Sequence, residues 1–140
     1  MSRFEDLSPY TYTPGIGVPQ GVEAFNVGWL EHQDDFPRGH VPEECVESLG
    51  VLCRDDSQNA MRGLFPCTLS HPEGQPEYPI SIEVGGRQVT LGAAEVRVVA
   101  QDGRWLIAPN LVHHYITAHS YLPPAEFIKA VTVRRTAPRT

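Results

Sequence analysis

The sequence is poor in cysteine and has no long apolar run. Three cysteines in 140 residues are too few, and odd in number, for a disulfide framework. No run approaches the ~18 apolar residues of a membrane span, and the opening MSRFEDLSPYTY has no signal-peptide core. G-x-G-x-x-G, Walker A and G-x-S-x-G patterns are absent as well. These absences predict a cytoplasmic protein that does not contact membranes.

Basic residues are also scarce. Eleven Lys and Arg stand against seventeen Asp and Glu, which gives a net charge of −6. This balance argues against binding to a phosphate backbone, so we expect no nucleic-acid partner. A protein partner is plausible, and a basic one fits best. Composition leaves the oligomeric state open.

The length suits a single domain over 1–140, and 41% hydrophobic residues suffice for a core. Thirteen prolines and twelve glycines predict many turns, above all in a long N-terminal segment. Its one apolar run, 25–30, is compatible with a short strand. Trp29 and Phe36 are interpreted as anchors that pin this segment to the core, with stacking on a ligand as the alternative.

A helix is predicted near 42–53. Pro42 suits the first turn, where its missing N–H costs nothing, and Glu43 and Glu44 complement the positive end of the helix dipole. Helical spacing places four residues toward the core: Cys45, Leu49, Leu52 and Cys53. The first two cysteines are therefore predicted to be structural.

Residues 78–108 predict a four-stranded antiparallel meander. A Gly-Gly turn at 85–86 would pair Ile82 with Val89 and Ile80 with Leu91. A second hairpin turning at 102–103 would pair Val98 with Ile107. The same register sets Ala100 against Trp105, and the strand carboxylates Glu83 and Glu95 are interpreted as solvent-facing charges.

Two C-terminal helices, at about 109–119 and 124–132, complete a predicted α+β fold in which helices cover one face of the meander. The first contains His114 and His119 in an H-x4-H arrangement. These two side chains lie about 140° apart on an ideal helix, so they reach one metal ion only if the last turn tightens or unwinds.

A loop holding Cys67 and His71 offers two more ligands. With His114 and His119 they would form a closed Cys-His-His-His set, which is typical of a structural zinc site. Two alternatives remain: His119 as a hydrogen-bonded core histidine, or Cys67 with His114 as a nucleophile pair. His113 is expected to be exposed.

Several segments resemble an uncharacterised family of small bacterial proteins: FEDLSPYTY, VGWL, FPRGHVPEE, RGLFPC, LGAAEVRV and APNLVHHYITAHSYLPPAEFIKAV. The family pattern resembles a C-x2-C plus H-x4-H zinc set. Cys67, His114 and His119 match it, whereas Ser70 replaces the second cysteine and His113 stands where tyrosine is usual. The resemblance implies a zinc ion here if His71 takes the vacant place.

Two functions follow as expectations. The first is a binding or accessory module, of the immunity type for example, that acts through protein contact and holds a structural zinc. The alternative is a small metal-dependent enzyme, a hydrolase or an accessory in metabolite biosynthesis. In that case His114 and His119 would be ligands and Cys67 the third ligand or nucleophile.

Overall fold

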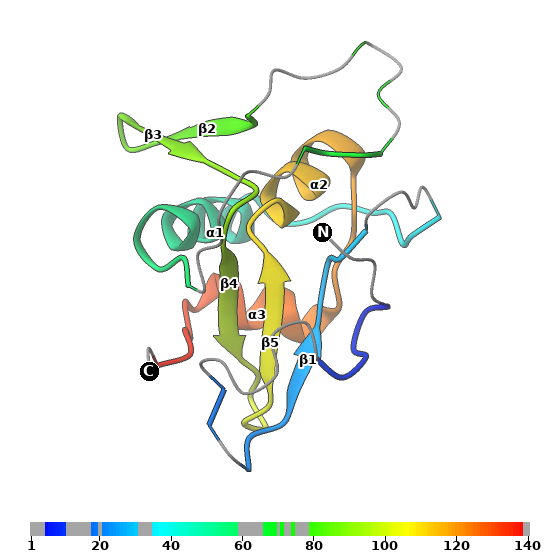
Figure 1. Cartoon of the computed structure of the whole chain (residues 1–140), viewed down its shortest axis with the longest axis vertical. Coiled ribbons are helices and arrows are strands. Elements are labelled where there is room, and N and C mark those ends of the chain that lie inside the picture. Colours follow the sequence, from blue (N-terminus) through cyan, green and yellow to red (C-terminus); the bar gives the residue numbers. More distant parts are fainter. Residues whose placement is uncertain are drawn as a thin grey trace.

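The computed structural model describes residues 5–10, 18–19, 21–30, 35–58, 66–69, 71, 74 and 79–138. Within them the fold is α+β, as predicted, with two sheets and three helices (Figure 1). The elements, in chain order, are β1 (Ala24–Asn26), α1 (Glu43–Asp55), β2 (Ser81–Val84), β3 (Arg87–Thr90), β4 (Glu95–Val99), β5 (Trp105–Pro109), α2 (Val112–His119) and α3 (Ala125–Thr132).

A three-stranded sheet in the order β1-β5-β4 forms the centre, with β1 parallel and β4 antiparallel to the fully buried β5. Its two faces follow the alternation along β5. Leu106 and Ala108 belong to the main core with α1 and α3, whereas Ile107 packs with Tyr10 and Trp29 from the N-terminal segment. Helices therefore cover one face, and the N-terminal segment lies on the other (Figure 1).

The β2–β3 hairpin has the predicted register. Ile82 pairs with Val89, and beyond the strand ends Leu91 donates to the carbonyl of Ile80 at 2.8 Å. Gly85 and Gly86 have φ of 59° and 80°, the left-handed values that a two-residue type I′ turn requires.

The four strands do not form one meander, because β2–β3 is a separate sheet. The outer edge of β4, where β3 would have paired, is already occupied. Gln58 exchanges two backbone hydrogen bonds with Glu95, and Val98 forms a bridge with Thr136 from the C-terminal segment. These segments leave β3 no partner edge, so the hairpin stands apart from the central sheet (Figure 1).

The predicted register of the second hairpin is wrong by one residue. Val98 pairs with Leu106 rather than Ile107, and Trp105 pairs with Val99 rather than Ala100. The loop has three residues, 101–103, closed by the N–H of Ala100 on the carbonyl of Arg104, with Gly103 at φ 93°. A glycine ending a three-residue loop shifts the pairing by one position relative to a two-residue turn.

The anchors of the N-terminal segment are confirmed. Trp29 is 1% exposed and its indole Nε1 donates to the carbonyl of Ile107 at 3.0 Å, while the Phe36 ring packs edge-on against Tyr121. The strand β1 overlaps the predicted run at only two residues. Cys45 and Cys53 are buried in the core, as predicted.

The predicted C-terminal helices are present with shorter bounds. The helix predicted from 109 begins at Val112, since Pro109 ends β5 and the N–H of Asn110 still donates to the carbonyl of Ala94. No helix in the described part of the chain is long and apolar enough to cross a membrane.

Candidate metal centre

The end of α2 brings its two histidines to the same side. Ser120 caps the helix in the left-handed conformation, with φ 58° and ψ 28°. Its N–H and that of Tyr121 both donate to the carbonyl of Tyr115, five and six residues back, instead of the usual four. The last turn is therefore unwound, which is the distortion that two ligands in H-x4-H spacing need.

Cys67 and His71 meet these histidines from a segment that runs beside α2 (Figure 1). Cys67 Sγ lies 3.4 Å from Nε2 of His119. Nε2 of His71 lies 3.1 Å from Nε2 of His119 and 3.4 Å from Nε2 of His114. One ligand atom from each of the four residues lies within 4.8 Å of the other three, so the group could hold a metal ion.

Three of the six separations between these ligand atoms are close to the edges of a tetrahedral metal site, and the other three are at most 4.8 Å. Zn–N bonds of about 2.05 Å and Zn–S bonds of about 2.3 Å make tetrahedral edges of about 3.4 Å between nitrogens and about 3.5 Å between sulfur and nitrogen. The three shortest separations here are 3.1, 3.4 and 3.4 Å. The His119 ring lies edge-on to both other imidazoles, at interplanar angles of 68° and 77°, so the Nε2 atoms point inward from different directions.

The electrostatics of the group favour a cation over protons. Burial and, to a smaller extent, the neighbouring His119, His71 and His113 together lower the pKa of His114 to about 4. His114 is therefore neutral at pH 7, the form in which imidazole binds a metal. Three imidazole nitrogens and one sulfur in contact offer lone pairs that a soft or borderline divalent ion matches.

The predicted residues divide clearly. Cys67, His71, His114 and His119 come together, with the sulfur 3.4 Å from Nε2 of His119 and within 4.8 Å of the ligand atom of His114. His113 is half-buried against α1 instead of exposed, because its ring lies over Gly50, which has no side chain to keep it out. Ser70 lies outside the described residues.

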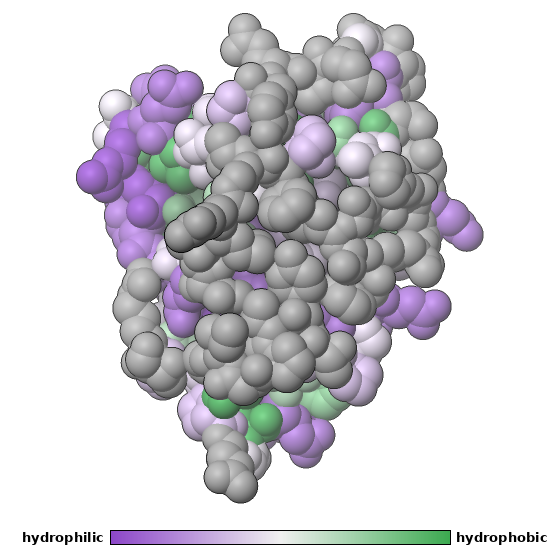
Figure 2. All heavy atoms as spheres, viewed as in Figure 1, coloured by the Kyte–Doolittle hydropathy of each residue, from purple (hydrophilic) through white to green (hydrophobic). Residues whose placement is uncertain are grey.

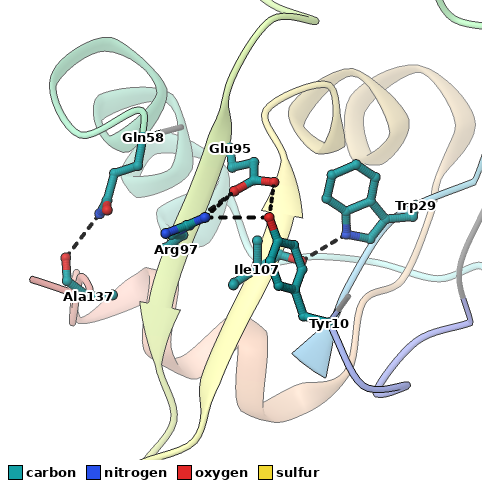
Figure 3. Close-up of polar contacts among 7 residues, drawn as sticks. All are labelled: Tyr10, Trp29, Gln58, Glu95, Arg97, Ile107 and Ala137. Atoms are coloured by element: carbon teal, nitrogen blue, oxygen red, sulfur yellow. Dashed lines mark hydrogen bonds and ion pairs between the residues drawn. The ribbon is translucent and has the colours of Figure 1, made fainter. Parts of the chain in front are cut away.

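A second polar cluster was missed by sequence reasoning. Glu95 is fully buried rather than solvent-facing, since the N-terminal segment covers its face of the sheet. Its carboxylate accepts from Tyr10 Oη at 2.6 Å and from Arg97 Nε at 3.0 Å, and Trp29 lies alongside (Figure 3). The alternation of Glu95 and Arg97 along one strand indicates an ion pair on one face of the sheet, but it does not indicate that this face is buried. Glu83 is exposed, as predicted.

Fold and site define a small α+β protein with a four-residue Cys-His candidate metal centre. The chain belongs to the family described as Domain of unknown function (DUF7919), whose model matches residues 2–132. The comparisons with curated proteins and with solved structures gave no match.

Proposed function

We propose that the protein binds one Zn²⁺ ion through Cys67, His71, His114 and His119. The observation that carries the proposal is the convergence of four ligand atoms within 4.8 Å, from two segments 43 to 52 residues apart. Four neutral or anionic donors brought together without a carboxylate match the nitrogen and sulfur preference of zinc over magnesium or calcium.

A structural role for the ion is the better supported one. Four protein ligands complete the tetrahedral shell, whereas a catalytic zinc keeps one position open for water. The ion would tie Cys67 and His71, neither of which lies in a helix or strand, to the end of α2. In this role zinc would cross-link the two parts of the chain and would not take part in catalysis.

We further propose that the zinc-tied protein is a binding or accessory module that acts by protein contact. Its acidic charge, −6 for 140 residues, suits a basic protein partner. The described surface offers exposed carboxylates that face each other from α1 and the β2–β3 hairpin, at Glu47 and Glu83.

The metal content of protein purified without added zinc tests the first proposal. We expect about one zinc per chain by mass spectrometry of the native protein, and loss of zinc in Cys67→Ser and His114→Ala. Cys45→Ser and His40→Ala are the matched controls, because Cys45 lies in the core and His40 is exposed elsewhere. A metal-free native protein that does not take up added Zn²⁺ would refute the site.

A metal-dependent enzyme is the second candidate, and one observation favours it. Nδ1 of His71 is buried without a hydrogen-bond partner in the described part of the chain. Metal-bound histidines are normally oriented by a hydrogen bond at the other ring nitrogen. Among the described residues His71 lacks such an orienting hydrogen bond, and its exchange with water would leave a Cys-His-His zinc with an open position.

His71→Ala separates the two functions. A structural site predicts that this variant loses zinc and stability together. The enzyme predicts that it retains zinc and that zinc-dependent hydrolysis of an activated ester, such as p-nitrophenyl acetate, persists or rises. Absence of hydrolysis in both zinc-loaded forms would exclude this enzyme.

A further inference from the structure

A cleft of about 330 Å³ lies between α1 and the β2–β3 hairpin, apart from the four-residue centre. It exists because the hairpin stands off the central sheet and closes over one face of α1. Residues of α1 spaced three and four apart share that face. The lining residues are Val46, Glu47, Gly50, Val51, Glu83, Val84, Gly85 and His113.

The floor of the cleft depends on Gly50. A glycine inside a helix costs about 1 kcal/mol relative to alanine, yet Gly50 occupies the middle of α1. A Cβ at this position would lie 3.3 Å from Cγ2 of Val84 and 3.7 Å from Nε2 of His113. The missing side chain keeps the floor open. Val46, Val51 and Val84 stay partly exposed around it.

The mouth of the cleft is acidic. Glu47 from α1 and Glu83 from the hairpin both line it, and both are exposed. Within the described residues neither carboxylate has a hydrogen bond or ion pair. The nearby Arg54 is held by Asp55 and by the carbonyl of Val84. Figure 2 shows green apolar atoms beside purple hydrophilic ones in this region, at the upper left.

We propose that this cleft receives a lysine side chain of a basic protein partner. An apolar floor suits the four-carbon stem, and a pair of carboxylates at the mouth suits the compact ammonium group. The negative charge of the whole chain would steer such a partner toward the cleft. This inference deepens the proposed binding function and rests on it.

The cleft is coupled to the metal centre through α2. His113 forms one wall of the cleft and precedes the candidate ligand His114. Tying α2 to the Cys67 segment therefore also fixes that wall. The proposal predicts that a lysine probe binds the zinc-loaded protein at least as well as the metal-free protein.

Titration of the zinc-loaded full chain with N-acetyl-lysine amide, followed by NMR, tests the proposal. We expect saturable shifts at Gly50, Val84 and His113 with a Kd in the range of about 10 mM, and several-fold weaker binding of N-acetyl-norleucine amide, which has the same stem without charge. Equal binding of the two probes, or shifts elsewhere only, would overturn the proposal.

Two variants separate steric from charge effects. Glu47→Gln with Glu83→Gln should weaken lysine binding about fivefold and leave norleucine binding unchanged. Glu43→Gln with Glu44→Gln is the matched control. It changes the net charge of the protein by the same amount, at two positions of α1 that do not line the cleft. Gly50→Ala should weaken both probes. Zinc content measured in every sample distinguishes failure of the metal site from failure of the cleft.

Discussion

The polar cluster around Glu95 and the one around Cys67 differ in the kinds of chemical groups that they bring together. Around Glu95, which is 0% exposed, the carboxylate, the Arg97 guanidinium and the Tyr10 hydroxyl satisfy one another. Around Cys67, three imidazole nitrogens and one sulfur converge, and none of these four ligand groups is a carboxylate. The two charges of a buried ion pair compensate each other. Lone pairs that face one another repel, and a cation between them would remove this repulsion. We interpret the cluster around Glu95 as structural and the cluster around Cys67 as a candidate metal-binding site.

Removing one partner of the closed cluster should have the largest effect on stability. Arg97→Ala leaves the Glu95 carboxylate buried without its countercharge, which costs about 3–5 kcal/mol in the free energy of unfolding. Urea denaturation measures the change. Arg87→Ala, at an exposed position of β3, is the control and should stay within about 0.5 kcal/mol. An equally small loss of unfolding free energy in both variants would mean that the cluster does not stabilise the fold.

Removing the metal should have the next largest effect. If free zinc stands at a hundred times its Kd, it stabilises the folded state by about 2.7 kcal/mol. We expect a chelator to lower the melting temperature of the native protein and to leave that of Cys67→Ser unchanged. If the chelator lowers both melting temperatures equally, the metal is bound elsewhere. The cluster around Cys67 would then not be a metal site.

Tyr10→Phe tests whether the N-terminal segment is held by the closed cluster. The lost hydrogen bond to the Glu95 carboxylate is charged and buried, and such bonds contribute about 1.5–3 kcal/mol. We expect a loss of about 2 kcal/mol with an unchanged zinc content. A coupled loss of zinc would show that the two clusters do not act independently.

The smallest effect is expected from mild acid on the metal-free protein. The unfolded chain protonates His114 near its ordinary pKa of 6.5, whereas the folded protein does so only near 4. Between these values the unfolded state holds more protons, so stability falls as pH falls through the window. From pH 7 to pH 6 the loss from this group is at most about 0.7 kcal/mol, and solvent screening of the partly exposed ring reduces it. His114→Gln should remove this part of the pH dependence.

Local patterns predicted much of the fold. The α+β class, the Gly-Gly hairpin with Ile82 opposite Val89, and the three helices each depend on neighbours within a few residues. The register of the second hairpin was missed because a glycine at 103 fits loops of two or three residues equally well. The single meander was wrong because Gln58 and Thr136, distant in sequence, occupy the edge of β4.

The candidate site was predicted more fully than its surroundings. Ligand chemistry singled out Cys67, His71, His114 and His119, and all four come together. The buried state of Glu95 was not predictable from strand alternation, since alternation does not tell which face a segment 85 residues away will cover. The burial of His113 was missed in a similar way, because its neighbour Gly50 lies on another helix, distant in sequence.

The placement of the four ligand residues along the chain has a consequence for the order of folding. Cys67 and His119 are 52 residues apart, and every strand from β2 to β5 lies between them. Closing so long a loop is entropically unfavourable until the intervening hairpins have shortened it. We therefore expect that an ion held by all four residues would bind late, after both hairpins have formed, and would stabilise the folded chain and not nucleate its folding.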